Sequence, residues 1–163
     1  MAARAYMSLL ETRPITTRVI TATLISGLGD AICQHLVPAP GGFDIARTVR
    51  FASWAVLITP LQHLWFTALQ RRFPSALTRV AFDQLVFAPP ATAAFLMYMG
   101  GGALVKERAW ATLHANWLVW PAVQAINFAF IPQKFTVLAC NVVGLFWSIA
   151  LSRLASPSAA QLT

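Results

Sequence analysis

Long apolar stretches alternate along this chain with short segments that carry arginine. Two of them, Phe51–Leu69 and Leu85–Val105, contain no Lys, Arg, Asp or Glu. Two more, Ile15–Val37 and Leu118–Leu151, are nearly free of charge. Each is long enough to cross a hydrocarbon core of ~30 Å, which takes a helix of ~20 residues. The pattern therefore predicts a protein that crosses a membrane several times.

The spacing of the apolar residues favours helices over a membrane barrel. Backbone polar groups in lipid must be satisfied internally, so only helices or closed barrels can span a bilayer. The apolar runs are long and do not alternate with period two. With 58% hydrophobic and 10% charged residues, the chain has no room for a separate soluble domain. We predict an all-α fold: an integral membrane bundle of four to five helices with short loops, residues 1–163 forming one membrane domain.

Proline and glycine divide the chain into segments. Pro38-Ala-Pro-Gly-Gly42 ends the first span, and the triplet Gly100-Gly-Gly102 lies near the end of the third. The last region is too long for a single crossing, and Pro132 is its natural break. The predicted spans are 15–37, 47–70, 77–105, 117–131 and 134–152, with interfacial pieces at 1–13 and 106–116.

A few polar side chains lie inside the apolar stretches. An Asp near the centre of a membrane helix costs ~2.5–3.5 kcal/mol on insertion, so such a group should face a partner or water. Two interpretations stay open for Asp30: a structural ion pair or capping bond within the bundle, or a carboxylate that lines a pore. The candidate pore-lining residues are Asp30, Gln34, His63, Asp83, Gln84, Gln124 and Asn127.

The formal net charge of +7 comes from basic residues at the ends of the segments. Basic side chains in these places anchor helix ends at lipid phosphates, so the charge does not indicate nucleic-acid binding. They could also draw anionic solutes toward a pore mouth. The candidate ligands of anionic lipid headgroups are Arg47, Arg50, Arg71, Arg72, Lys106 and Arg108.

The sequence contains no recognisable catalytic set, phosphate loop or metal-ligand spacing. Cys33 and Cys140 lie in apolar runs without CxxC or Cys/His spacing, which is typical of small buried side chains. An intramembrane enzyme would have to be built from Asp30, His63 and Asp83, and no other feature of the sequence supports one. We therefore expect no enzymatic activity, no cofactor and no metal.

The order of motifs resembles the Mpv-seventeen / peroxisomal membrane protein twenty-two family of small organellar membrane proteins. The resemblance runs from Tyr6 to Ser152, and its most specific block begins at Asn116-Trp117 and ends at Ile131-Pro132. The residues that carry it are Gly29, Asp30, Gln34, Pro60, His63, Trp65, Asp83, Gln84, Pro89, Asn116, Trp117, Trp120, Pro121, Gln124, Asn127, Phe128, Pro132 and Trp147.

The resemblance implies four membrane spans and a role as a channel for small solutes. It places the protein in the mitochondrial inner membrane or, alternatively, in the peroxisomal membrane. The acid-poor N-terminal stretch, with Glu11 as its acidic residue, favours mitochondria. We expect membrane lipids and small-molecule solutes as partners. A second hypothesis is a non-transporting accessory subunit of a larger organellar complex, such as a respiratory one; a homo-oligomer is also open.

Overall fold

The computed structural model describes residues 2–38 and 41–155, and the elements in these ranges are all helical. This confirms the predicted all-α fold. The helices are α1 (Ala2–Thr12), α2 (Pro14–Leu36), α3 (Ile45–Arg72), α4 (Ala76–Phe82), the π-helical turn η1 (Asp83–Phe87), α5 (Ala88–Phe130) and α6 (Gln133–Ala155).

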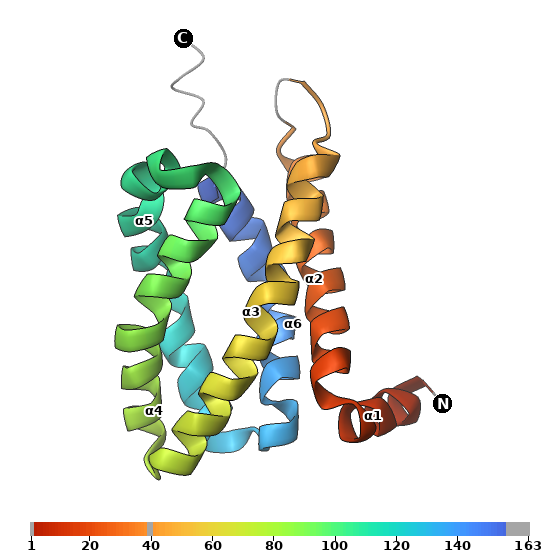
Figure 1. Ribbon diagram of the computed structural model, residues 1–163, viewed down its shortest axis with the longest axis vertical. Helices are drawn as coiled ribbons and strands as arrows, with labels where there is room; N and C mark the ends of the chain where they lie inside the picture. The colour runs from red at the N-terminus through yellow and green to blue at the C-terminus, as the bar shows by residue number, and fades with distance from the viewer. Residues whose placement is uncertain (1, 39–40, 156–163) are drawn as a thin grey trace.

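The described helices make five passes along the bundle (Figure 1). α2 and α3 form the first two. The third is a continuous column of α4, η1 and the first half of α5. The second half of α5 returns behind it, and α6 makes the fifth pass. α1 lies across the end of the bundle at which α2 begins.

Gly101 reverses the chain in the middle of α5. Its backbone has φ 74° and ψ −169°, a conformation that essentially only glycine adopts. The reversal falls four residues before Val105, where the third span was predicted to end. Residues 106–116, predicted to be an interfacial piece, form the start of a helix that runs on to Phe130. Their place at the membrane interface stays a prediction.

The prolines explain several helix boundaries. Pro14 opens α2, where its missing N–H costs nothing. Pro132 separates α5 from α6, as predicted. Pro89 and Pro90 follow a π-helical turn in which the Ala88 N–H donates to the Asp83 carbonyl, five residues back. Neither proline has an N–H, so two helical donors are missing just after this change of pitch.

α2 packs most extensively on α3 and α6, whereas α3 touches α5 much less. The close contact between α2 and α6 depends on Gly29, because a Cβ built there would lie 2.5 Å from the Ser148 Cβ. Two separate clusters that contain aromatic side chains fill the interior of the bundle. One contains Phe51 and Phe95, and the other contains Phe66 packed edge-on against Phe128.

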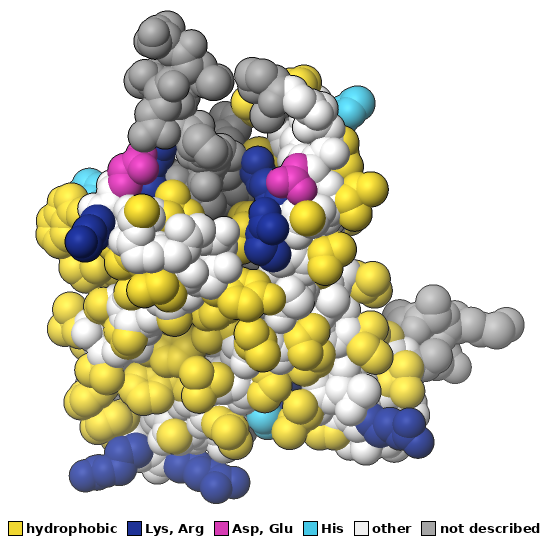
Figure 2. Space-filling model, turned by 45° about the horizontal axis from the view of Figure 1, so that its top comes forward, with side chains coloured by type: hydrophobic (Ala, Val, Ile, Leu, Met, Phe, Trp, Pro, Cys, Tyr) yellow, Lys and Arg dark blue, Asp and Glu magenta, His cyan; other side chains and the backbone are white. Residues whose placement is uncertain are grey.

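The outer surface has the distribution expected of a membrane bundle. Figure 2 shows Lys, Arg, Asp and Glu side chains near the two ends and mainly hydrophobic side chains between them. Leu24, Leu118 and Phe146 are each more than two-thirds exposed. So much exposed apolar surface would be unfavourable in water but suits contact with lipid.

Two of the described helical stretches are long and apolar enough to cross a membrane by length and composition: Pro14–Leu36 and Ala76–Phe130. The second is 55 residues long and contains the Gly101 reversal, so it supplies two of the five passes. A shorter apolar stretch covers Ala139–Leu151 in α6. The bounds of the individual membrane crossings stay a prediction.

Candidate functional site: a polar cavity inside the bundle

A cavity of about 200 Å³ lies in the interior of the bundle. Side chains from α2, α3, η1, both halves of α5 and α6 line it. Three of the predicted pore-lining residues are among them: Asp83, Gln84 and Gln124. No Lys or Arg occurs among the described residues that line the cavity. Most of the lining side chains are apolar, and the polar ones supply one carboxylate together with amides, hydroxyls and indole N–H groups.

Asp83 is the centre of this polar wall. Its Oδ1 accepts a hydrogen bond from the Trp65 indole at 3.0 Å. Its Oδ2 accepts from the Gln84 amide at 2.8 Å and from the Gln124 amide at 3.2 Å. The donors come from α3, η1 and the second half of α5. The carboxylate, which is 4% exposed, thus links three segments that are far apart in sequence.

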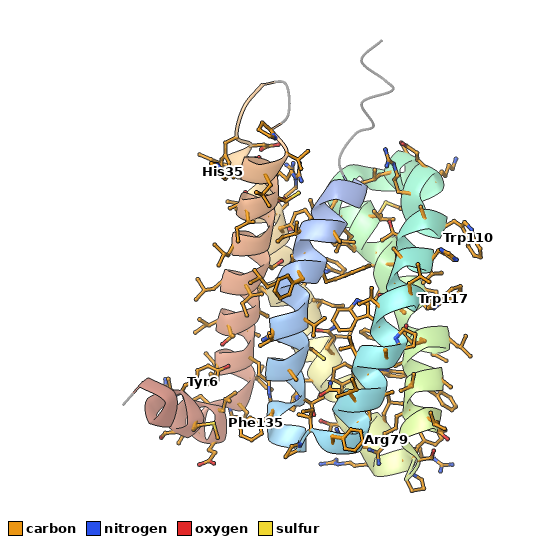
Figure 3. The ribbon with its side chains drawn as sticks, turned by 180° about the vertical axis from the view of Figure 1, so that it is seen from behind. Tyr6, His35, Arg79, Trp110, Trp117 and Phe135 are labelled. Carbon is orange, nitrogen blue, oxygen red and sulfur yellow. The ribbon has the colours of Figure 1, made fainter. Side chains whose placement is uncertain are left out.

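Gln84 extends the network to the second half of α5. Its side-chain Oε1 accepts from the Asn116 amide at 3.0 Å, and its backbone carbonyl accepts from the Trp117 indole at 3.1 Å. Figure 3 shows Trp117 on this half of α5, below the outward-pointing Trp110. Asp83 and Gln84 are neighbours in sequence, yet both are buried. The π-helical turn that contains them opens the helix backbone at this point.

Asn127 lies beyond Gln124 and off the cavity wall. Its amide nitrogen is 3.1 Å from Gln124 Oε1, 3.1 Å from Cys140 Sγ and 3.3 Å from the Thr136 carbonyl. These contacts connect α5 to α6 just beyond the turn at Pro132. Asn127 therefore has a position suited to helix packing, which amides that bond across membrane helices commonly support.

Three residues that line the cavity each have a polar atom that is buried within the protein and has no hydrogen-bond partner among the described protein atoms: Thr112 Oγ1, Trp120 Nε1 and Asn141 Nδ2. Sequence reasoning did not identify Thr112, which is 1% exposed. The signal was present, because Thr112, Asn116, Trp120 and Gln124 follow one another at intervals of four on a helical face. Thr112 was not selected because 106–116 was interpreted as a piece at the membrane surface.

Asp30 and Gln34 form a second polar cluster, between α2 and α3, and are not on the cavity wall. The fully buried Asp30 carboxylate accepts from Arg47 Nε at 2.9 Å, from Thr48 Oγ1 at 2.7 Å and from Gln34 Nε2 at 2.8 Å. Gln34 also accepts from the Asp44 N–H. Of the two interpretations considered from sequence, these contacts correspond to the structural ion pair.

His63 is also absent from the cavity wall. Its ring contacts the Arg18 guanidinium, with Nδ1 3.1 Å from Arg18 Nη1. This contact connects α3 to α2. The neighbouring residue Gln62, which was not selected from sequence, lies on the cavity wall instead.

The basic side chains fall into two groups. Arg47 was predicted to bind lipid headgroups, but it pairs with the buried Asp30, and its side chain is only 16% exposed. Arg50 pairs with Asp44 and Arg108 with Glu107. Arg71, Arg72 and Lys106 are exposed at the ends of their helices. Headgroup binding by these exposed side chains stays a prediction.

Comparison with known proteins identifies the family. A model of the Mpv17 / PMP22 family matches residues 102–152. Protein SYM1 of Gibberella zeae is 38% identical over 165 residues, which cover 91% of this chain and 94% of the relative. The chain belongs to the Mpv17 / PMP22 family. It is accordingly an organellar membrane protein, and the resemblance inferred from its motifs is confirmed.

Other members of the Mpv17 / PMP22 family align over most of the chain. Protein SYM1 of Saccharomyces cerevisiae is 35% identical over 170 residues, covering 90% of this chain and 86% of the relative. PXMP2/4 family protein 3 of Dictyostelium discoideum is 34% identical over 165 residues, which cover 93% of this chain and 89% of the relative. No solved structure matches the chain.

Many residues that carry the Mpv17 / PMP22 resemblance make the contacts described above. Trp65 and Gln124 hold Asp83, while Asn116 and Trp117 hold Gln84. Other members of the set shape the helices themselves: Pro60 and Pro121 lie inside α3 and α5, and the Trp120 and Trp147 rings pack edge to face at 6.1 Å.

Proposed function

We propose that this protein is a channel-like component of the mitochondrial inner membrane that passes small polar metabolites and performs no catalysis. The observation that supports this most is the cavity inside the bundle. Its lining includes the buried carboxylate of Asp83 together with the amides of Gln62, Gln84 and Gln124. A polar solute that enters such a cavity replaces the hydrogen bonds it made with water, so its passage through the membrane costs less free energy.

The lining suggests which solutes would pass most easily. Basic residues at the ends of the bundle attract anions, but the described wall has no cation to hold them. Small uncharged polar molecules therefore fit the cavity better than multiply charged anions, for which burial without a counter-charge is costly. Anionic lipid headgroups would bind the exposed Arg71 and Arg72 at one end of the bundle.

Reconstitution into liposomes tests the proposal. Gly144 lines the cavity, and no atom lies within 4 Å of a Cβ built there. The Cβ of Gly144→Leu therefore meets no atom, and the rest of its side chain should occupy part of the cavity. The matched control is Ala122→Leu, which adds the same side chain at an exposed position outside the cavity.

Liposomes with the wild-type protein should release small sugars but retain a large dextran. Gly144→Leu should slow the release severalfold, and Ala122→Leu should leave it unchanged. Release no faster than from empty liposomes would refute the channel. Fractionation of organelles addresses the location, since recovery with peroxisomes would favour the peroxisomal alternative.

A second candidate is a non-transporting accessory subunit of a larger membrane complex. One observation favours it: Asp83 already accepts hydrogen bonds from three donors of its own chain, as a purely structural carboxylate would. Native electrophoresis in mild detergent distinguishes the two. A mass far above that of a small homo-oligomer would support the subunit, whereas an isolated protein that conducts solute would support the channel.

A further inference from the structure

Gln62 differs from three other amide side chains that line the interior cavity. Gln84 and Asn116 share a hydrogen bond of 3.0 Å, and the amide nitrogens of Gln84 and Gln124 both donate to Asp83. Gln62 lines the same cavity but makes no side-chain hydrogen bond with any residue that the structure describes. The contacts that hold the bundle together therefore do not use its amide.

The Gln62 side chain points into the bundle rather than toward lipid. On the same side of α3, Thr59 and Phe66 are buried. Leu61 and Leu64, on the outer side, are each more than half exposed. Gln62 itself is partly exposed, and its polar atoms are not among those sealed inside the protein. Its amide is therefore accessible to a molecule in the cavity.

An amide in the interior of a membrane protein needs a hydrogen-bond partner. Transfer of an unbonded amide to apolar surroundings costs roughly 2–7 kcal/mol, and the hydrocarbon region supplies no water to bond it. The chain supplies no partner for Gln62 among the described residues. The partner must then be a molecule inside the cavity, either water or a solute that replaces it.

The cavity lining also determines which solutes complement this amide. Gln62 can both donate and accept, and it lies one helical turn before Trp65, whose indole donates to Asp83. A carboxylate has about four acceptor positions, and Asp83 uses three of them within the protein. Hydroxyl groups, which donate and accept, suit both side chains. The carboxylate disfavours an anion, since no Lys or Arg lies on the described wall.

The size of the cavity limits the solute further. Its volume is about 200 Å³, which is below the ~300–1,000 Å³ of pockets that hold drug-sized ligands. A molecule of only a few carbon and oxygen atoms fits this space. Size, charge and hydrogen bonding together indicate a short chain of hydroxyl-bearing carbons.

We propose that Gln62 is the residue that selects the solute, and that the solutes it selects are short, neutral polyols. This inference deepens the proposed channel and rests on it. The amide of Gln62 exchanges hydrogen bonds with hydroxyls of the polyol, and Asp83 accepts from another hydroxyl. A compound of the same length with fewer hydroxyls leaves the amide without a partner and therefore binds less well.

Protection of a cavity thiol measures this binding without relying on solute flux. Gly144→Cys, in a background of Cys33→Ala and Cys140→Ser, places the thiol on the cavity wall. In proteoliposomes, erythritol should slow its modification by an impermeant methanethiosulfonate. The four-carbon diol 1,4-butanediol, which lacks the two inner hydroxyls, should slow it less.

Gln62→Met removes the amide but keeps an unbranched side chain of similar length. It should raise the erythritol concentration that gives half-protection by about three- to tenfold, as expected for one hydrogen bond. It should leave protection by 1,4-butanediol unchanged, whereas a role in packing alone would alter protection by both compounds. The matched control is Gln70→Met, the same change on α3 outside the cavity, and it should affect neither.

Two results would overturn the inference: equal protection by erythritol and 1,4-butanediol before Gln62 is changed, or equal half-protecting concentrations for Gln62→Met and Gln70→Met. Release of erythritol from liposomes separates this failure from that of the channel. Either result, together with release faster than from empty liposomes, would leave the channel standing without selection by Gln62. Protection that depends on Gln62, without any release, would support the binding site and refute the channel.

Discussion

Buried polar residues in this protein form separate clusters, each with its own charge balance. Asp30 is paired with Arg47, whereas Asp83 is held by neutral donors. The sequence could identify both carboxylates as inward-facing, since a charge directed at lipid is costly. It could not tell them apart, because the decisive partner of Asp30 lies in another helix. Because the sequence did not reveal this contact, Arg47 was predicted from its position at the end of a segment to bind a lipid headgroup.

The Asp30–Arg47 pair should be important for stability. Arg47→Gln leaves the buried carboxylate without its counter-charge and should lower the free energy of unfolding by about 3 kcal/mol. Asp30→Asn combined with Arg47→Gln should cost less than the sum of the single changes, with a coupling of about 0.5–3 kcal/mol. Thermal unfolding in detergent measures both effects.

Arg50 provides the control for this pair. Its contact with Asp44 spans 3.7 Å, and both side chains are substantially exposed, so Arg50→Gln should cost no more than about 1 kcal/mol. Strictly additive effects of Asp30→Asn and Arg47→Gln would show that the pair contributes nothing beyond its separate residues.

At the scale of helices, glycine sets how closely they approach and where they reverse. The length and apolarity of the segments predicted the helices, and Pro132 predicted the division before α6. The triplet at 100–102 indicated an end of the third segment. The sequence did not show which glycine reverses the chain, because φ is decided by how the two halves of α5 pack.

Gly29 and Gly144 should respond in opposite ways to a methyl group. Gly29→Ala places a Cβ 2.5 Å from the Ser148 Cβ and should destabilise the protein by about 1–3 kcal/mol. Gly144→Ala meets open space and should be neutral or slightly stabilising. Adding Ser148→Gly should restore most of the loss in Gly29→Ala. If it restores nothing, the contact between α2 and α6 is not as close as described.

Gly101 should tolerate no side chain. At φ 74° and ψ −169°, Gly101→Val should cost about 1–3 kcal/mol or more in the free energy of unfolding. The neighbouring Gly102 has no positive φ, and a Cβ built there lies in ordinary contact with Met97 Cε at 3.9 Å, so it serves as the control. Equal midpoints of thermal unfolding for Gly101→Val and Gly102→Val would contradict a reversal at Gly101.

For the whole molecule, we propose that each of the five passes of helix crosses the membrane. The family resemblance implies four spans, whereas the residue pattern left four or five open. In the structure, the second half of α5 is a full pass, because residues 102–130 run from the Gly101 reversal to the turn at Pro132. Sequence could not decide this, since a mixed-polarity segment can lie on a surface or lead into a span.

Single cysteines placed in the loops between the helices test how many times the chain crosses the membrane. Gly42→Cys and Gly102→Cys should react with an impermeant thiol reagent from one side of the organellar membrane. Ser75→Cys and Pro132→Cys should react from the other. The background is Cys33→Ala with Cys140→Ser. Reaction of Gly102→Cys and Pro132→Cys from the same side would mean that the second half of α5 does not cross.

The most direct test of the central claim is whether water reaches the interior cavity. In the same cysteine background, Gly144→Cys places a thiol on the cavity wall, and Ala122→Cys places one on the lipid-facing surface. A thiol reacts as the thiolate, which forms in contact with water. In proteoliposomes, an impermeant methanethiosulfonate should modify Gly144→Cys and spare Ala122→Cys, while both react after denaturation. Protection of Gly144→Cys equal to that of Ala122→Cys would contradict a water-accessible cavity.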